Sequence, residues 1–534
     1  RGETFYGTIK INKSGTSAAP ITFSAYGTGP KPILTTLNEV EGWTSMGNGI
    51  YVANVDITPE GRVNVVTIND LIQEMGRFPN FNEPNKGFKN ITSTNSSSNI
   101  TSNDFGSNTN WRGAEIVIRK NPWVHDRHEV ISNTSSSINF QAIQGRYPVR
   151  ANYGFFIQNH LNTLDQYGEW YYDRTNRKLY VYLGNQSNIP QIKISSKNNL
   201  VELNWNVNHI HFNELELHGA NSIGVLIQDG TDIHIKNTDI KFMGEYAVKG
   251  LNSNNLLVEH CNIDHSINNG LYVENRSQNV IFRNNTITNT YMFVGMGKNG
   301  DLNGKAIYTS NRSNNGKIEN NRIINTGYIG INFGGDNTIV KNNYVSEFCL
   351  HKTDGGGIYL WEGWENKNAT GRIIENNIVV NGIGYSNGTD KDGLIDPVPV
   401  EGIYVDDNTS GIHIRNNSIS NISKHGIYIH NARNIQITSN LIHNTYEAIY
   451  LNHDEFGDPV RNISVENNQF FAIKNESNFI NKSSIKQDHS SMASFNGNYY
   501  IRPFGNDFGI LVNFLNQQTW SLTSNLSNLN WWQK

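Results

Sequence analysis

The chain has 534 residues, of which 37% are hydrophobic and 17% are charged, and its formal charge is −4. This near-neutral balance argues against a general nucleic-acid binder, which would carry a basic excess. The sequence has no apolar run of about 18 residues, the length from which a membrane-spanning helix is recognised. We therefore expect neither nucleic acid nor a membrane as a partner.

Residues 1–55 read as short strands between Gly, Ser and Pro turns, in segments such as GTIKINKSG and GIYVANV. We interpret them as the N-terminal coils of a solenoid. The chain opens at RGETFYGTIKIN as though inside a first coil, and for that reason we expect a processed or trimmed N-terminus.

The repeat vanishes between residues 56 and 195. A Ser/Asn-rich tract at 91–110 is typical of an exposed loop. The segment GEWYYDRTNRKLYVYL, residues 168–183, has alternating strands on both sides of a polar turn, which predicts an antiparallel hairpin. We therefore expect an inserted β-sandwich or barrel-like domain in this region.

Residues 196–470 contain recurring units such as GLYVENRSQNVIFRNN, which begins at Gly270, and GIYVDDNTSGIHIRNN, which begins at Gly402. Unit starts at positions 330, 357, 402, 426 and 448 are separated by 27, 45, 24 and 22 residues. A bare step of about 22–25 residues corresponds to one coil of a parallel β-helix, and longer steps indicate inserted loops. The fold class predicted is therefore all-β, a parallel β-helix with an inserted antiparallel domain.

One column of asparagines marks the same corner of each unit. Asparagine tolerates a left-handed backbone, and its side chain can bond turn amides, so stacked asparagines predict a continuous ladder. The column holds Asn262, Asn285, Asn321, Asn343, Asn377, Asn417, Asn440 and Asn468.

The last segment, residues 471–534, loses this column and ends in the Trp-rich NLNWWQK. We expect it to cap the solenoid, since an open edge strand invites aggregation. The two cysteines, Cys261 and Cys349, lie in different coils, so we expect buried free thiols and no disulfide.

Strand alternation assigns a face to each position of the unit. Counting the small residue as zero, the apolar positions one and three point into the coil, so position two should face outward. That column holds Tyr272, Tyr308, Tyr359, Tyr404, Tyr428 and Tyr450. The rings can form a platform for sugar faces, or they can simply stack and stiffen the sheet.

Acids and other polar residues follow this tyrosine column. Position four holds Trp361, Asp406 and His430, and Glu362, Asp407 and His453 stand one residue further. Asp354 precedes GGGIY, and Glu401 precedes the next unit. Carboxylates on neighbouring coils can be about 5–10 Å apart, the range that glycoside hydrolysis uses. Clustering also raises the pKa of one acid, as a proton donor requires.

Several of these residues also have structural explanations. Asp354 and Asp407 are typical turn formers, and Glu401 shares a column with Lys305, His425 and Glu447 that suits a surface charge ladder. The histidines His430 and His453 can be solvated or can bind substrate. No spaced His/Cys set predicts a zinc site, so we expect no metal or cofactor, and structural calcium stays open.

The Asn-ladder coils resemble the right-handed parallel β-helix superfamily of carbohydrate-active enzymes. The early β-rich interruption resembles a subset of glycoside hydrolases, such as certain α-galactosidases and β-xylosidases, with a sandwich or barrel inserted in the β-helix. GRFPNF at 76–81 is similar to an Arg-aromatic-Pro-Asn segment at the start of that insertion. The resemblance implies an acid role for Asp354 and a base role for Asp406 or Asp407.

These features lead to the hypothesis of a monomeric, secreted, cell-surface or periplasmic glycoside hydrolase that cleaves a polysaccharide. We expect internal cleavage with inversion, and an insertion that walls one end would instead favour cleavage at chain ends. Lys305 and His430 suit an anionic, sulfated algal glycan. The residues expected to bind substrate are Tyr359, Trp361, Glu362, Tyr404, Tyr428, His430, Lys305 and His453. The alternatives are a polysaccharide lyase on the same fold and a non-catalytic glycan-binding solenoid.

Overall fold

The structure, a computed structural model, describes the chain except residues 96, 106–108, 143–146, 187, 364–367, 390–395, 474–476, 504–509, 517–520 and 528–534. Near the C-terminus it describes only the backbone of β52 (Ile510–Asn516) and β53 (Ser521–Ser527). The described helices are the three 3-10 turns η1 (Pro84–Gly87), η2 (Leu161–Thr163) and η3 (His489–Ser491). None of these helices is long and apolar enough to cross a membrane.

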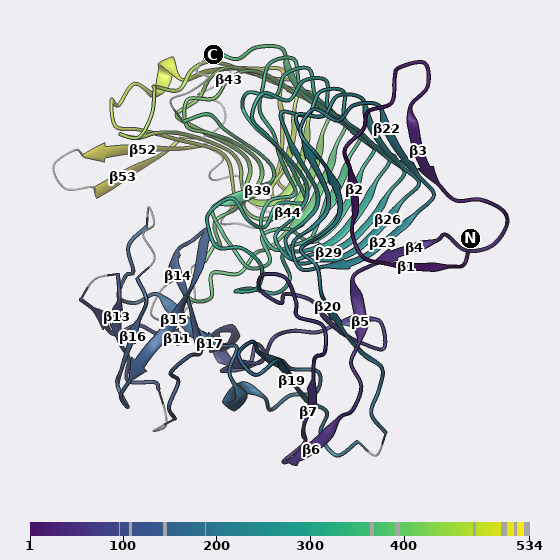
Figure 1. Cartoon of the computed structure of the whole chain (residues 1–534). Coiled ribbons are helices and arrows are strands. Elements are labelled where there is room, and N and C mark those ends of the chain that lie inside the picture. The colour runs from purple at the N-terminus through teal and green to yellow at the C-terminus, as the bar shows by residue number, and fades with distance from the viewer. Residues whose placement is uncertain are drawn as a thin grey trace.

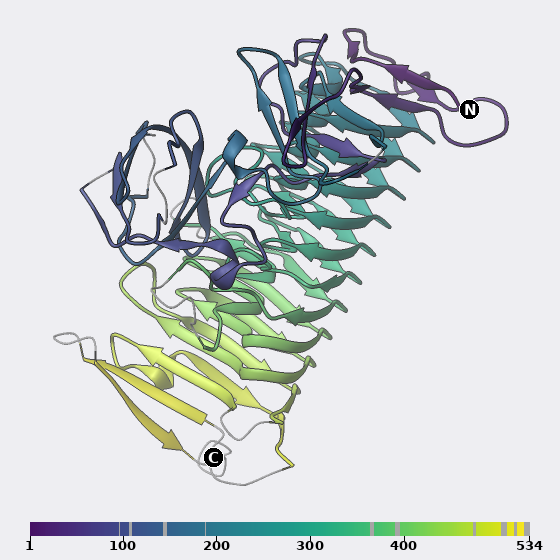
Figure 2. The same ribbon diagram turned by 90° about the horizontal axis from the view of Figure 1, so that it is seen from below.

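The strands of two large sheets stack coil upon coil along one axis and form the solenoid (Figures 1 and 2). The first, the twelve-stranded sheet, takes one strand from each coil. Its strands are, in spatial order, β3 (Ile21–Ser24), β22 (Ile210–Asn213), β25 (Ile233–Lys236), β28 (Leu257–Glu259), β31 (Ile281–Arg283), β34 (Lys317–Glu319), β37 (Ile339–Lys341), β40 (Arg372–Glu375), β43 (Ser410–Arg415), β45 (Arg433–Thr438), β47 (Arg461–Glu466) and β50 (Ala493–Asn496).

The 25-stranded sheet contains two rows that merge where strands run long. The front row carries the tyrosine column and contains β2 (Ile9–Ile11), β21 (Asn199–Leu203), β24 (Ile223–Gln228), β27 (Tyr246–Leu251), β30 (Asn269–Glu274), β33 (Ile307–Thr309), β36 (Ile331–Asn332), β39 (Gly355–Trp361), β42 (Val400–Asp406), the second halves of β44 (Ser418–His430) and β46 (Leu441–His453), β49 (Asn478–Ser484) and β52. The second row contains β1 (Thr4–Tyr6), β4 (Ile33–Thr35), β23 (Glu216–Ala220), β26 (Asp239–Met243), β29 (Asn262–Ser266), β32 (Thr286–Thr290), β35 (Arg322–Thr326), β38 (Tyr344–Ser346), β41 (Ile378–Gly382), the first halves of β44 and β46, β48 (Gln469–Phe471) and β51 (Tyr499–Ile501).

The apolar positions of each unit fill the interior, as the alternation predicts. Ile403 and Val405 are fully buried and align with Ile427 and Ile429 of the next coil. One continuous core runs from Ile11 to Met492. Complete burial of each aliphatic side chain contributes about 1.5–3 kcal/mol, so stacked identical columns stabilise the solenoid coil by coil.

The predicted asparagine ladder exists, and the two residues of each Asn-Asn corner have different roles. The first asparagine, such as Asn376 or Asn416, has φ near +55°, and the second is buried. The second side chain accepts from the amide of its counterpart one coil earlier: Asn377 N–H donates to Asn417 Oδ1 over 2.9 Å. The ladder thus satisfies backbone groups that the corner would otherwise leave unpaired.

The ladder differs from the prediction at both ends. Cys261, not Asn262, occupies the first rung, where its amide donates to Asn285 Oδ1 over 3.0 Å, while Asn262 is exposed. At the other end Asn468 N–H donates to Asn498 Oδ1 over 2.9 Å, so the ladder continues beyond residue 471. The expected buried free thiols are confirmed for Cys261 and Cys349.

The N-terminal coil is shorter than expected. The strands up to β4 join the solenoid, but β5 (Leu37–Glu39) and β7 (Ile50–Asn54) pair antiparallel with strands of the insertion. GIYVANV therefore belongs to the insertion and not to a coil. Its alternating pattern fits an antiparallel edge as well as a coil strand, and the local sequence does not separate the two.

The insertion contains three antiparallel sheets. One is β18 (Trp170–Asp173), β19 (Lys178–Tyr182), β7 and β6 (Thr44–Gly47), which confirms the predicted hairpin. The second is β5, β20 (Ile192–Ser195), β8 (Val66–Ile68) and β9 (Leu71–Ile72). The third has eight strands: β10 (Arg77–Phe78), β17 (Gly154–Gln158), β14 (Glu115–Asn121), β15 (Val124–Asn133), β16 (Ser137–Phe140), β13 (Asn99–Thr101), β12 (Ser93–Thr94) and β11 (Lys89–Asn90).

Two cores hold these sheets. The two smaller sheets share one core, which also includes Phe242, Ile267 and Met296 of the solenoid. The eight-stranded sheet encloses its own core, which includes Ile91 and Ile100. The Ser/Asn-rich tract is therefore not simply an exposed loop: its described part forms the β12–β13 hairpin around these two buried isoleucines.

The C-terminal segment continues the coils and then reverses direction. The strands β48 to β51 keep parallel pairing with the coils before them. Then β52 pairs with β49 and turns back antiparallel along β53 (Figure 2). The Trp-rich end NLNWWQK lies outside the described residues.

Candidate active site

Asp354 stands immediately before β39 in a left-handed conformation, with φ +60°. Its amide donates to Pro399 O over 2.8 Å, and the Tyr328 hydroxyl donates to Asp354 O over 2.7 Å. The glycine that follows is required by the same tyrosine, since a Cβ on Gly355 would lie 2.4 Å from the Tyr328 ring. The GGG run thus lets the backbone approach Tyr328 closely enough to fix Asp354.

Asp406 ends β42, one coil further along the front row. The Tyr359 hydroxyl donates to its Oδ2 over 2.7 Å, and the Asp407 amide donates to its Oδ1 over 2.8 Å. His430 Nδ1, from the next coil, lies 2.8 Å from the same Oδ1. Three hydrogen-bonding groups therefore surround the carboxyl group of Asp406.

The imidazole of His430 connects two acids. Its Nε2 lies 2.8 Å from Asp454 Oδ2, and Asn431 Nδ2 donates to Asp454 Oδ1 over 2.7 Å and to Asp407 Oδ1 over 2.8 Å. Burial opposes the charge, but hydrogen bonds to Asp406 and Asp454 hold the pKa of His430 well above its usual value. His430 thus links Asp406 and Asp454 through its two ring nitrogens.

Two tyrosines link Asp354 to Asp406 across neighbouring strands. Tyr359, on the strand that follows Asp354, bonds Asp406, while Tyr404, on the strand of Asp406, lies 3.5 Å from Asp354 Oδ1. The two tyrosine rings meet edge to face at 5.1 Å. The two acids therefore share one compact aromatic setting.

The structure gives the two acids different surroundings. Burial, together with the charges of Asp406 and Glu401, raises the pKa of Asp354 to about 7. Burial and the charge of Asp406 also raise the pKa of Asp407. A protonated Asp354 beside a hydrogen-bonded Asp406 is the arrangement that supplies a proton donor and a base at neutral pH.

The tyrosine column stacks in register, as predicted. Tyr359, Tyr404 and Tyr428 are direct neighbours along the front row, and the Tyr404 and Tyr428 rings lie 4.6 Å apart. Tyr404 is only 3% exposed, so this part of the column is a packed stack and not an open platform. Trp361 is 43% exposed and aligns with Asp406 on the neighbouring strand, so its indole can face a ligand beside that acid.

Two residues expected to bind substrate are buried instead. Glu362 is fully buried and forms an ion pair with Arg372, and His453 lies 3.3 Å from Ser484 Oγ. The expected outward position is wrong for both side chains, because position five of the unit has the parity of the apolar positions one and three and points into the coil. Strand alternation, applied one residue further, would have identified this. The role of these two side chains in substrate binding stays a prediction.

Glu401 and Lys305 are also enclosed. The expected surface charge ladder is a buried chain in which His425 lies 3.4 Å from Glu401 and 3.0 Å from Glu447. Lys305 Nζ donates to Asn332 Oδ1 over 2.6 Å, and burial lowers the pKa of Lys305 to about 8. Glu401 therefore acts on Asp354 through its charge.

Three residues near the two acids were not predicted from the sequence: Tyr328, Asp454 and Lys352. Asp454 follows the strand of the coil after His430, so the register of the repeat would have located it. Lys352 Nζ donates to Asn303 O over 2.7 Å, and burial lowers its pKa to about 7. The insertion also reaches this point, since Thr353 N–H donates to Pro122 O over 3.0 Å. Thr353 and Pro122 are more than 200 residues apart in the sequence, and no local pattern predicts their contact.

A hollow of about 640 Å³ lies elsewhere, on the outer face of the twelve-stranded sheet, beside Ile373, His413 and Gln436. Its described lining includes no carboxylate, whereas Asp354 and Asp406 lie beside strands of the front row.

A family model described as a right-handed β-helix region matches residues 199–374 and 306–499. No curated protein matches the chain. A solved structure titled "Glycoside hydrolase" is 17% identical, with a TM-score of 0.61, and the match covers 78% of this chain and 84% of that one. The A-module of the mannuronan C-5 epimerase AlgE4 of Azotobacter vinelandii is 13% identical (TM-score 0.32, 59% and 77% covered).

The tailspike protein of E. coli bacteriophage HK620, solved with a hexasaccharide, is 12% identical (TM-score 0.38, 60% and 58% covered). At these identities the likeness concerns the fold alone. The two family matches together span residues 199–499, more than half of the sequence and nearly all of the coils described above. The chain belongs to the right-handed β-helix family.

Proposed function

We propose that the protein is a glycoside hydrolase that cleaves a polysaccharide, with Asp354 as the general acid and Asp406 as the general base. The observation that carries the proposal is the contrast between the two acids. Burial and neighbouring charges keep a proton on Asp354 up to a pH of about 7, while Tyr359, His430 and a backbone amide donate to Asp406. A raised pKa suits Asp354 to the role of general acid, and we assign the base role to the neighbouring Asp406.

The reaction needs no group beyond the chain and water. Asp354 donates its proton to the glycosidic oxygen as the bond to the anomeric carbon breaks. Asp406 accepts a proton from a water molecule that attacks the same carbon, so both protons and the leaving group are accounted for. The exposed indole of Trp361, beside Asp406, offers a ring for the apolar face of a sugar. Secretion or display at the cell surface is part of the proposal.

The first experiment measures new reducing ends on a panel of neutral, uronic and sulfated polysaccharides. Wild type is compared with Asp354→Asn and Asp406→Asn. Glu375→Gln is the matched control, because Glu375 pairs with Arg415 on the twelve-stranded sheet. We expect reducing ends from wild type and the control, and a loss of at least about 10³-fold in both aspartate variants, since each removes one partner of the acid–base pair.

Ultraviolet absorbance of the products, followed in parallel, separates hydrolysis from elimination. A lyase would create an unsaturated uronate that absorbs, and a hydrolase would not. If products absorb, or if both aspartate variants keep their activity, the proposal is wrong. Glycan binding without product from wild type on the glycan that it binds would favour the non-catalytic solenoid.

Two finer points of the proposal need their own measurements. Proton NMR of the first product tests inversion, because retention would require Asp406 to act as a nucleophile at a carboxyl separation of about 5–5.5 Å. Chromatography of early products tests internal cleavage: a broad size range is expected, and release of one short product would instead indicate action at chain ends.

A further inference from the structure

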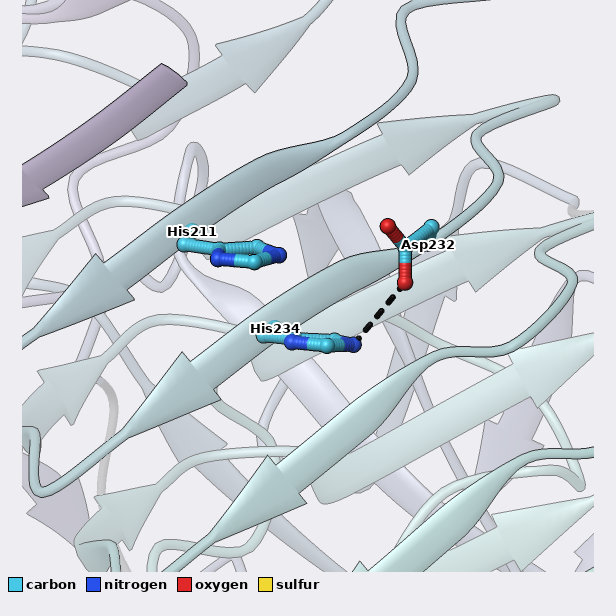
Figure 3. A group of neighbouring side chains, drawn as sticks. All are labelled: His211, Asp232 and His234. Atoms are coloured by element: carbon cyan, nitrogen blue, oxygen red, sulfur yellow. Dashed lines mark ion pairs between the residues drawn. The ribbon is translucent and has the colours of Figure 1, made fainter. Parts of the chain in front are cut away.

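A second cluster of polar side chains lies on the outer face of the twelve-stranded sheet, near its N-terminal end. His211 on β22 and His234 on β25 are register partners, and their rings stack at 4.2 Å with an angle of 9° (Figure 3). Asp232 stands just before β25 with φ +57°, and its Oδ1 lies 3.0 Å from His234 Nε2. The proposed function assigns no role to this cluster.

The ligand atoms of the three residues converge. One atom from each of His211, Asp232 and His234 lies within 4.8 Å of the others. The Nε2 atom of His211 is covered from solvent and has no hydrogen-bond partner among the described residues. A buried polar atom without a partner is unfavourable, which points to a ligand that would satisfy it.

A fourth residue orients the carboxylate. His209 Nδ1 lies 2.8 Å from Asp232 Oδ2, which leaves Oδ1 directed at the two imidazoles. This is the arrangement that supports many metal ligands, in which an outer hydrogen bond fixes the orientation of the coordinating group. Figure 3 shows the aspartate beside the Nε2 edge of His234, with the two rings parallel.

The charges around the cluster favour the ligand forms of these side chains. Burial lowers the pKa of His211, and burial and the neighbouring His211 lower that of His234. The hydrogen bond from His209 lowers the pKa of Asp232. Lys236, on the strand of His234, also disfavours protonation of both rings, and Glu259 lies 3.8 Å from that lysine. Neutral imidazoles and an ionised carboxylate are what a metal requires.

We propose that His211, Asp232 and His234 bind one divalent ion of the zinc class, such as Zn²⁺, Co²⁺ or Ni²⁺. Two imidazoles with one carboxylate select these ions, whereas Ca²⁺ and Mg²⁺ prefer oxygen ligands throughout. With metal–ligand bonds of about 2.0–2.1 Å, tetrahedral ligand atoms lie about 3.3 Å apart, so the stacked rings would rotate to bring their nitrogen atoms together on the ion. A fourth position stays open to water or to an outside ligand.

The ion would join adjacent coils, since β22 and β25 are successive strands of the same sheet. The other cluster of this shape, formed by Asp406, Asp407 and His430, belongs to the candidate active site. The two clusters lie on different sheets, so variants can separate them.

The test uses the full chain after treatment with a chelator. Co²⁺ titration followed by visible d–d absorption, and Zn²⁺ titration followed by calorimetry, are compared in wild type, His211→Gln, His234→Gln and Asp232→Asn. His413→Gln is the matched control: His413 occupies the same column of the same sheet and bonds Thr438 over 2.7 Å. We expect saturable binding of one equivalent in wild type and control, and a dissociation constant at least about tenfold higher in each site variant.

Zn²⁺ should also raise the melting temperature of wild type and control, and not that of the site variants. Circular dichroism of each metal-free variant checks that it folds, and Asp232→Asn keeps both imidazoles in place if a histidine variant fails. The proposal is overturned by the absence of saturable binding in wild type, or by equal binding in wild type and both histidine variants, which would place the ion elsewhere.

Discussion

The pKa of Asp354 depends in part on the charge of a neighbouring residue, Glu401. Glu401 is buried and lies 3.4 Å from His425, yet its charge is among the causes that raise the pKa of Asp354. Glu447 holds the same histidine from the other side, at 3.0 Å, and is not among those causes. The two glutamates therefore make a matched pair for testing whether long-range charge sets the proton donor.

Glu401→Gln should shift the alkaline limb of the pH–rate profile to lower pH by roughly one unit, because removing a negative charge lowers the pKa of Asp354. Glu447→Gln should leave the limb near pH 7. The measurement is kcat/KM against pH on the glycan found by the first experiment. Equal shifts in both variants would show that the histidine, and not Glu401, controls the limb.

Asp354→Asn should inactivate the enzyme and yet stabilise the fold at neutral pH. The folded pKa of Asp354 is raised to about 7 from an ordinary value of 3.8, so the stability it contributes is present below pH 4 and is lost as pH rises through 7. Each pKa unit corresponds to about 1.4 kcal/mol, so the gain at pH 8 reaches at most a few kcal/mol.

The measurement is the melting temperature of wild type and Asp354→Asn at pH 4 and pH 8. We expect the difference to grow with pH. Asp488→Asn serves as a contrast, because hydrogen bonds to Ser484 and Arg461 lower the pKa of Asp488 and outweigh its burial. Its loss should therefore cost stability at pH 8. A constant difference for Asp354→Asn would mean that its pKa is not raised.

At the scale of single residues, the sequence indicated which acids lie beside the strands better than it indicated which side chains are exposed. Asp354 and Asp406 follow from the repeat register, because a motif beside each strand repeats coil by coil. The expected outward position of Glu362 and His453 was wrong, because strand alternation was not applied one position further. Tyr328 comes from a turn between β35 and β36 of the preceding coil, whereas Lys352 lies two residues before Asp354. The contact of Thr353 with Pro122 joins distant segments. No local pattern encodes such contacts.

At the scale of elements, the asparagine corner is the unit that holds coils together. Asn417 Nδ2 donates to Ile374 O over 2.9 Å and to Asn440 Oδ1 over 3.0 Å, while its Oδ1 accepts from Asn377 N–H over 2.9 Å. All of these groups are buried. Asn421, at the next corner, is exposed with φ +56°, and its Nδ2 donates to Asn381 Oδ1 over 2.9 Å.

Asn417→Ala should destabilise the protein by about 2–4 kcal/mol, because it leaves several buried groups without partners. Asn421→Gly keeps the left-handed backbone and should cost less than about 1 kcal/mol. Urea denaturation followed by circular dichroism measures both. Equal losses would mean that exposed and buried ladders contribute alike.

The element scale is also where the sequence was most informative. The step of about 22–25 residues and the asparagine column predicted coils that the strand pairing confirms. The boundary near residue 55 was wrong, because an isolated strand such as Ile50–Asn54 gives no sign of whether its partner is parallel or antiparallel. Partner choice in sheets depends on tertiary contacts.

At the scale of the molecule, the insertion and the solenoid share a core. Met296, from a loop of the solenoid, is 2% exposed and belongs to the cluster that holds the two smaller sheets together. The insertion is therefore a packed part of the molecule and not a tethered domain.

Met296→Ala should cost about 2–5 kcal/mol through the cavity it leaves, and the insertion and solenoid should still unfold together. Met46→Ala is the control, since Met46 is 53% exposed, and it should change stability by less than about 0.5 kcal/mol. Scanning calorimetry with tryptophan fluorescence measures both. A separate early transition of the insertion in wild type would contradict the shared core.

The asparagine ladder also keeps the spacing between coils constant, whatever the number of residues in each coil. Successive rungs from Asn285 to Asn498 are 36, 22, 34, 40, 23, 28 and 30 residues apart, yet every amide-to-Oδ1 distance is 2.9–3.1 Å. Additional residues leave the stack as loops and return to the same corner without disturbing the rungs. Loops around the acids can therefore be exchanged or lengthened independently of the scaffold, so a change of substrate requires no change of architecture.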